Sequence, residues 1–185
     1  MNFKKTKLNG VYIIEPEIFK DARGSFVKVF HEETFKENKL QFNTKEVFYS
    51  ESKENVIRGM HFQNPPQAHA KIVYVVKGKI IDVVLDIRTG SPTYGEFIST
   101  ELSVDDKKMI YIPVGFAHGF SVISESATAV YMQTTVHSPE LDSGIRWDSF
   151  GMDWNIKQPI ISERDERFDA FSDLESPFIY GEEEK

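Results

Sequence analysis

Apolar residues in this chain gather in short runs rich in valine, isoleucine, phenylalanine and tyrosine. Runs of this length and composition are typical of β-strands, and turn residues such as Gly90-Ser91-Pro92 separate many of them. The runs predicted to be strands are Val11–Ile14, Phe26–Phe30, Glu46–Tyr49, Ile72–Val76, Ile80–Ile87, Phe97–Leu102, Met109–Ile112, Phe120–Ile123 and Ala127–Thr135.

Helical patterning is weak, and only Glu32–Asn38 and parts of the stretch after Trp154 are expected to be helical. Many short strands in 185 residues favour a β-sandwich or barrel of antiparallel strands. Apolar residues on both faces of a strand, as in Val73–Val76, favour a closed or double-layered sheet. We expect one domain over residues 1–185, with a flexible acidic tail from about residue 179.

Composition narrows the function classes. The net charge is −7, from 22 basic and 29 acidic residues, which argues against a nucleic-acid or anionic-membrane binder but leaves room for an anionic small molecule. The absence of cysteine excludes disulfides, thiolate nucleophiles and Cys-ligated zinc. No signal-like or membrane-spanning apolar run is found, so a cytoplasmic protein is expected. The 15 Phe and 7 Tyr fit core packing, or else some of them line a pocket or a subunit interface.

A first candidate cluster is the run Arg-Gly-Met-His-Phe-Gln that begins at Arg58, with Lys71 downstream. An extended backbone would place Arg58, Met60 and Phe62 on one face. His61 would then share the other face with Gln63 and could point into a lumen. A single histidine of this kind is more often structural than catalytic.

Three further clusters have ordinary structural explanations of their own. The pattern Pro-x-Gly-x-x-His places a tight turn just before His118, and this can be a packing motif. Tyr131 lies in a predicted strand, where tyrosine normally packs. The run Ser162–Asp165 is typical of a helix cap followed by solvated charges.

Two of these clusters resemble the paired motifs of the cupin superfamily, which normally supply two His, a Glu and a further His to a metal. Here Gln63 stands where the second His is usual, and Lys71 lies near the Glu position, while His118 is retained. Lysine offers no deprotonated donor at neutral pH, so this is a poor divalent-cation site. The resemblance therefore indicates a cupin without a metal.

The combined motifs resemble those of the dTDP-4-dehydrorhamnose 3,5-epimerase family from about Gly10 to Asp165. Supporting segments are Phe19–Gly24, Asp86–Gly95 and Gly144–Trp147. The resemblance implies an all-β cupin jelly-roll β-sandwich with a short helical C-terminal segment. It also implies cofactor-free epimerisation of a nucleotide-diphosphate-linked 4-keto-6-deoxy sugar at C3, C5 or both, in deoxysugar and surface-polysaccharide biosynthesis.

The resemblance also implies roles for individual residues. His61 would be the base, and Asp165 would fix its tautomer. Lys71 would stabilise the enolate oxygen, and Tyr131 would be the acid on the opposite face of the sugar. Arg23, Arg58 and His118 match positions that hold the diphosphate or sugar, and Gln63 is a further candidate contact. The family arrangement implies a homodimer in which Arg23 reaches the neighbouring subunit's site.

The chain departs from the family pattern mainly at positions expected to contact the nucleotide. Glu46 and Phe48 replace a Gln and an Asn, and His137 replaces a Tyr that stacks on thymine. The other candidate substrate-binding replacements are Lys28, Asp142 and Arg164. A carboxylate accepts hydrogen bonds but donates none, so a CDP- or GDP-linked 4-keto sugar is an alternative substrate. Epimerisation at one centre only is part of this alternative.

Three other classes stay open at this point. A metal-dependent cupin would use the two histidines with Gln63. A non-catalytic sugar-binding cupin would be expected to lack the acid or the base, yet both Tyr131 and His61 are present. A sugar 3,4-ketoisomerase would share the enolate chemistry, and product analysis would distinguish it.

Overall fold

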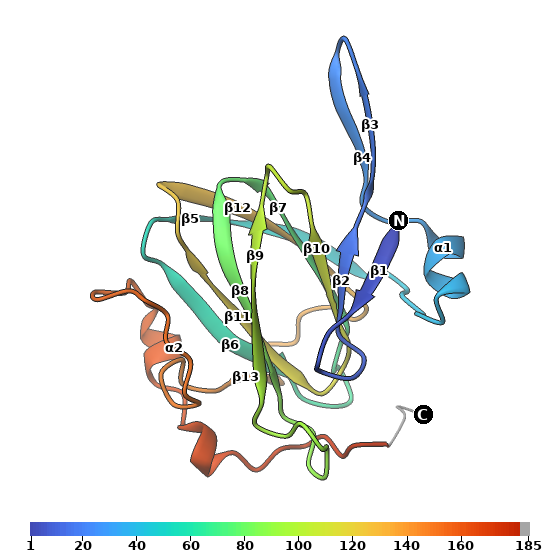
Figure 1. Cartoon of the computed structure of the whole chain (residues 1–185). Helices are drawn as coiled ribbons and strands as arrows, with labels where there is room; N and C mark the ends of the chain where they lie inside the picture. Colours follow the sequence, from blue (N-terminus) through green and yellow to red (C-terminus); the bar gives the residue numbers. More distant parts are fainter. Residues whose placement is uncertain (182–185) are drawn as a thin grey trace.

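Two antiparallel β-sheets face each other as a sandwich in the computed structural model, which describes residues 1–181 (Figure 1). The six-stranded sheet has the order β1 (Asn2–Lys5), β2 (Tyr12–Glu15), β10 (Met109–Ile112), β7 (Lys71–Lys77), β12 (Ser126–Gln133) and β5 (Glu46–Lys53). The five-stranded sheet has the order β13 (Asp142–Gly144), β6 (Ile57–Gln63), β11 (Phe116–Val122), β8 (Lys79–Asp86) and β9 (Phe97–Ser103). The all-β sandwich predicted from the strand runs is confirmed.

Apolar residues cover both faces of each sheet. Val73 and Ile110 of the six-stranded sheet pack against Val84 of the five-stranded sheet and form the core between them. The outer face of the six-stranded sheet is covered by α1 (Glu32–Glu37), whose buried Phe35 packs with Ile72. The expected helix Glu32–Asn38 therefore exists and explains the apolar residues on the second face of β7.

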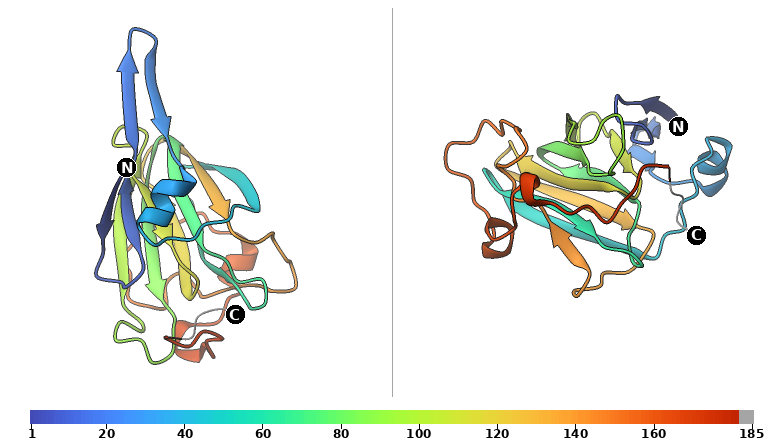
Figure 2. Two further views of the ribbon diagram at one scale, coloured as in Figure 1. Left: turned by 90° about the vertical axis from the view of Figure 1, so that its right-hand side faces the viewer. Right: turned by 90° about the horizontal axis from the view of Figure 1, so that it is seen from below.

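The C-terminal segment covers the outer face of the five-stranded sheet. It contains only two short helices, α2 (Glu163–Glu166) and the 3₁₀ helix η1 (Phe171–Asp173). Trp154 packs in a core cluster with Met60 and Leu85, and the segment then runs below the sandwich (Figure 2). It ends by pairing with Thr89, whose N–H donates to Phe178 O and whose carbonyl accepts from the Tyr180 N–H. The flexible tail was expected from about residue 179; Tyr180 belongs to this pairing, and residues 182–185 lie outside the described residues.

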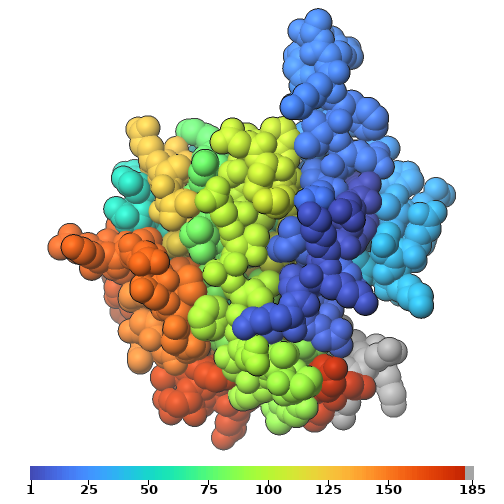
Figure 3. All heavy atoms as spheres, viewed as in Figure 1, coloured from blue at the N-terminus to red at the C-terminus, as the bar shows by residue number. Residues whose placement is uncertain are grey.

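A separate hairpin, β3 (Glu17–Asp21) with β4 (Gly24–Lys28), stands clear of the sandwich (Figures 1 and 3). Phe19 and Phe26 face each other on it with ring centroids 6.1 Å apart, and they are 56% and 63% exposed. The strand predicted at Phe26–Phe30 lies two residues too late, and β3 was not predicted. The physical reason is that no face of the hairpin is buried in this chain, so it carries no alternating pattern.

An irregularity in β6 changes which side chains face the interior. His118 of β11 pairs with His61, but two residues later Phe120 pairs with Arg58, so β6 contains one extra residue. Such a bulge reverses the alternation of side chains beyond it. Arg58 therefore lines the same pocket as His61, while Met60 is buried in the core behind the sheet. The predicted grouping of Arg58 with Met60 is wrong for this reason.

Candidate active site

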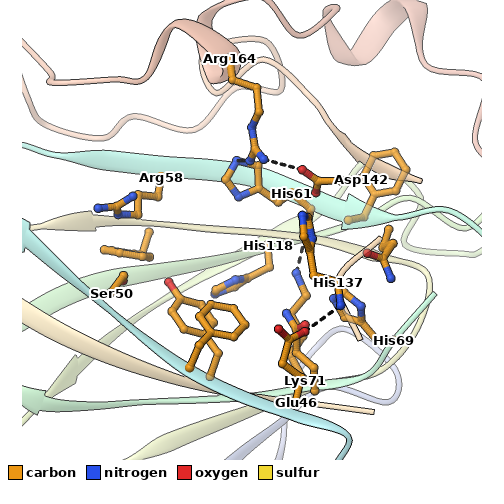
Figure 4. Close-up of a pocket in the computed structure, with 16 residues that line it drawn as sticks. Glu46, Ser50, Arg58, His61, His69, Lys71, His118, His137, Asp142 and Arg164 are labelled. Atoms are coloured by element: carbon orange, nitrogen blue, oxygen red, sulfur yellow. Dashed lines mark hydrogen bonds and ion pairs between the residues drawn. The ribbon is translucent and has the colours of Figure 1, made fainter. Parts of the chain in front are cut away.

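One pocket of about 390 Å³ lies between the two sheets, a size suited to a small-molecule ligand. In the view of Figure 4, Arg58 and Ser50 lie on one side, Glu46, His69 and His137 on the other, and His61 and His118 between them. The pocket is lined by Glu46, Phe48, Ser50, Arg58, His61, Phe62, Gln63, His69, Lys71, His118, Phe120, Tyr131, Gln133, His137, Asp142 and Arg164.

His61 is held by a carboxylate that comes from a distant part of the chain. Its Nε2 lies 2.9 Å from Asp165 Oδ1, and the Gly59 N–H donates to Asp165 Oδ2 at 3.0 Å. Asp165 is positioned by the N-cap of α2, where its own N–H donates to Ser162 Oγ. Arg164 Nη2, which can only donate, lies 2.6 Å from the same Nε2. If the Nε2 proton points to Asp165, Nδ1 keeps the lone pair and is the basic atom of the ring.

The charges around His61 favour a neutral ring. Burial lowers the pKa of His61 below its usual value, and the positive charges of Arg164 and Lys71 act in the same direction, against the stabilising effect of Asp165. Burial alone would raise the pKa of Asp165, but hydrogen bonds from His61 and Gly59 outweigh it and hold that pKa well below its usual range. The pair is therefore a neutral imidazole and a carboxylate near neutral pH.

Tyr131 and Lys71 come from β12 and β7 of the six-stranded sheet, whereas His61 comes from β6 of the five-stranded sheet. Burial lowers the pKa of Lys71 to about 8, against the opposing effect of Asp142 and Asp82, and its Nζ donates to His61 O at 3.3 Å. Burial also raises the pKa of Tyr131 well above its usual value, which keeps the phenol protonated. The pocket thus has a neutral imidazole on one wall and a protonated phenol and a lysine on the other.

A second histidine–carboxylate pair lies beneath the pocket. His118 Nε2 is 2.8 Å from Asp82 Oδ2, and both side chains are buried. The His118 ring stands edge-on to Tyr131, with centroids 6.2 Å apart and an interplanar angle of 74°. His118 therefore lines the pocket as predicted and also contacts the tyrosine.

The rim of the pocket is fixed by polar contacts within the chain. Arg58 Nε donates to Ser52 Oγ at 2.9 Å, and Arg164 forms ion pairs with Asp142 and Asp165. Arg58 is exposed and the Arg164 side chain is half exposed, so both guanidinium groups can be reached by an anion.

The loop after β12 is held by two of the predicted contact residues. Glu46 Oε2 accepts the His137 N–H at 2.7 Å. The amide of Gln63 donates to Val136 O at 3.1 Å, and its Oε1 accepts the Ser138 N–H at 2.8 Å. Gln63 thus supports the wall of the pocket through its backbone partners.

Arg23 and Lys28 do not reach the pocket of their own chain. Both lie on the projecting hairpin, where Arg23 bonds only to Asp21 within residues 1–181 and its side chain is 90% exposed. Lys28 is 3.9 Å from Glu17.

His69, Ser50 and Gln133 line the pocket but were not singled out from the sequence. Burial and the nearby Lys71 lower the pKa of His69 to about 3, so this ring is neutral. Its place two residues before Lys71, on the same side of an extended chain, was the available signal. Within residues 1–181, no three His, Asp or Glu side chains are grouped as a metal site requires, and none of the helices is long and apolar enough to cross a membrane.

A cupin-type sandwich whose pocket places a His–Asp pair opposite a tyrosine and a buried lysine has titratable groups on two walls, which is the arrangement that an enzyme of the epimerase class needs to move protons on two faces of one substrate. The sequence matches the dTDP-4-dehydrorhamnose 3,5-epimerase family over residues 5–173. The chain belongs to this family.

Relatives cover nearly the whole chain. The dTDP-4-dehydrorhamnose 3,5-epimerase of Methanothermobacter thermautotrophicus is 42% identical over 88% of this chain and 90% of its own length. The epimerase of Legionella pneumophila, solved in complex with dTDP-4-keto-L-rhamnose, has a TM-score of 0.90 and 33% identity, covering 94% of each chain. ChmJ, a 3'-monoepimerase from Streptomyces bikiniensis solved with dTDP-quinovose, has a TM-score of 0.86 and 27% identity, covering 90% of this chain and 86% of its own.

Proposed function

We propose that this protein epimerises a dTDP-linked 4-keto-6-deoxy sugar at the two carbons beside the ketone. The substrate would be dTDP-4-keto-6-deoxyglucose and the product dTDP-4-dehydrorhamnose, an intermediate of deoxysugar biosynthesis. The observation that supports this most strongly is the placement of His61 and Tyr131 on opposite sheets of one pocket, with Lys71 buried beside them. No redox step is needed, because epimerisation only removes a proton and returns it on the other face.

The first step is deprotonation. His61 Nδ1 takes the proton from the carbon beside the ketone, and the C–H electron pair forms the enolate double bond while the ketone oxygen becomes an oxyanion. Asp165 stabilises the imidazolium that results. The Lys71 ammonium stabilises the oxyanion in a site from which water is largely excluded, where such a charge is most effective.

The second step is reprotonation from the opposite face. Tyr131 donates its phenolic proton to the carbon and the double bond returns to the ketone. The phenolate then takes a proton from solvent and the His61 imidazolium releases one to solvent, which resets both groups. The raised pKa of Tyr131 makes the phenolate basic enough to take that proton. C3 and C5 both flank the ketone, so the same groups serve both centres after the ring changes its conformation.

The nucleotide diphosphate is assigned to the open side of the pocket. Arg58 and Arg164 present guanidinium groups there, and their planar forks suit phosphate oxygens. We propose dTDP rather than CDP or GDP, because solved relatives hold dTDP-linked ligands. His137 and Glu46 lie at the end of the pocket where a nucleobase would contact the loop after β12.

The active unit is proposed to be a homodimer. Two-stranded hairpins are marginally stable alone, and this one leaves Phe19 and Phe26 more than half exposed. A second subunit would cover these rings, and Arg23 would then enter the partner subunit's pocket.

Solvent exchange tests the reaction. In heavy water, the wild-type protein with dTDP-4-keto-6-deoxyglucose should introduce deuterium at C3 and C5 and yield the inverted sugar. His61→Ala should abolish both labels. If the wild-type protein inverts one centre only, it is a mono-epimerase. Deuterium exchange that persists in His61→Ala would contradict the assignment of the base.

The same experiment separates the other classes. A sugar-binding cupin without activity would bind the nucleotide sugar and introduce no deuterium. A 3,4-ketoisomerase would move the carbonyl to C3, which carbon NMR of the product would show.

A further inference from the structure

The ring of Tyr131 is stacked against Phe48. The two residues are direct cross-strand partners in β12 and β5, and their rings lie nearly parallel, with centroids 4.7 Å apart and an interplanar angle of 13°. The edge of the His118 ring contacts Tyr131 as well. The tyrosine is thus held by ring contacts on two sides.

Ring contacts matter here because of what the hydroxyl has to do. Ser50 is a hydrogen-bond partner of the Tyr131 hydroxyl, and in the reaction the phenol has to turn its proton toward the substrate carbon instead. The plane of the ring must then be set by packing, and Phe48 supplies its only parallel stack within residues 1–181. Ordinary core packing does not explain Phe48 well, because it is 40% exposed and lies on β5, an edge strand of the sheet.

The neighbours of Phe48 show that this contact is particular to its position. Val47 and Tyr49, on either side of it in β5, point away from the pocket and are 57% and 66% exposed. Phe48 alone of these three lines the pocket.

We propose that Phe48 is a positioning residue that holds the Tyr131 ring so that its hydroxyl stays on the sugar face opposite His61. The proposal rests on the function proposed above. Its consequence is that Phe48 determines how many deprotonation events end in inversion, because a tyrosine that turns away leaves His61 to return the proton to the face from which it came.

The expected size of the effect follows from stacking. Aromatic pairs contribute enough beyond their buried area to change a conformational equilibrium about three- to tenfold. Phe48→Leu keeps an apolar side chain of similar bulk and removes the stack, whereas Phe48→Tyr keeps an aromatic ring.

The test compares inversion with exchange in heavy water. For Phe48→Leu we expect kcat for epimerisation to fall three- to tenfold, KM to stay within twofold, and deuterium exchange without inversion to appear. Phe48→Tyr should restore the wild-type ratio of inversion to exchange. Tyr94→Leu is the matched control, because Tyr94 is 39% exposed and its ring contacts that of Phe171 away from the pocket, in a tilted pair with centroids 5.5 Å apart; it should leave the ratio unchanged.

A second measurement does not depend on the reaction. In protein labelled with ¹³C-tyrosine, the Tyr131 ring signal, identified by its loss in Tyr131→Phe, should show the upfield shift of a stacked ring and should lose it in Phe48→Leu. If wild-type protein shows no epimerisation, the proposed function fails while this signal still tests the stack.

Three results would overturn the proposal. Exchange and inversion that fall equally in Phe48→Leu would indicate general damage. A raised KM with unchanged kcat would make Phe48 a substrate contact. A Tyr131 signal that does not move would show that the stack does not hold the ring.

Discussion

The two side chains whose protonation the proposed reaction depends on both have lowered pKa values, His61 from burial and neighbouring cations and Lys71 from burial. The proposed reaction needs the neutral form of the first and the charged form of the second. Activity should therefore rise with pH as His61 loses its proton and fall as Lys71 loses its own.

We predict a bell-shaped dependence of kcat/KM on pH. The acid limb should lie below 6.5, the ordinary pKa of histidine, because the pKa of His61 is lowered. The alkaline limb should lie at about 8, the pKa of Lys71. In Lys71→Arg, whose guanidinium stays charged, the remaining activity should lack this limb. An alkaline limb above about 10 in the wild type would contradict the role given to Lys71.

Glu46 is the residue at which nucleotide choice can be tested. We expect calorimetry to show that dTDP binds at least tenfold more tightly than CDP, GDP or UDP, a difference of about 1.4 kcal/mol. Glu46→Gln should keep this order, because the amide oxygen can still accept the His137 N–H. If CDP or GDP binds best and Glu46→Gln removes that preference, Glu46 reads the base instead.

At the scale of elements, the site depends on how closely β6 and β11 approach. Gly59 has a φ of +125°, and a Cβ built there would lie 2.5 Å from Gly119 Cα and 2.8 Å from His118 O. A side chain would force the two strands apart between Arg58 and His61. It would also displace the N–H that donates to Asp165.

We predict that Gly59→Ala lowers the free energy of unfolding by about 3 kcal/mol or more and removes activity. Gly90→Ala is the control, because Gly90 also has a positive φ but a Cβ there would meet nothing within 4 Å. It should cost only about 1 kcal/mol, from backbone strain. Urea unfolding measures both, and equal losses would show that close approach of the strands is not what Gly59 provides.

Most strands could be predicted because their buried positions are apolar, as at Val73 and Val84, and this gives a recognisable pattern in the sequence. The hairpin could not, since Phe19 and Phe26 are buried by nothing in this chain. Pocket residues were predicted through the family motifs rather than through spacing. The side of β6 on which Arg58 lies was missed because a bulge depends on tertiary pairing. His69 lies outside the quoted motifs, and its place two residues before Lys71 was its only signal.

At the scale of the whole molecule, the proposed dimer makes a prediction that does not require a dimer structure. Arg23→Ala and His61→Ala should each have little activity alone. When the two variants are mixed and allowed to exchange subunits, each mixed dimer gains one complete site if Arg23 acts in the partner. Random pairing should then restore about a quarter of wild-type activity.

Sedimentation of the same mixture gives the mass of the active species, against 21.3 kDa for one chain. A mixture that stays inactive while subunits exchange would place Arg23 in its own subunit's site or outside any site. A fully active monomer would contradict the proposal that the active unit is a dimer.

The contact between His61 and Asp165 spans 104 residues of sequence. Ribosomes add about 5–20 residues per second, so the carboxylate is synthesised about 5–20 s after the histidine it orients. During that interval all strands of both sheets are synthesised, yet the imidazole has no partner to fix its tautomer. The nascent chain is therefore expected to be catalytically silent until α2 has emerged, and a chain that stops before it would fold around a pocket that cannot start the reaction.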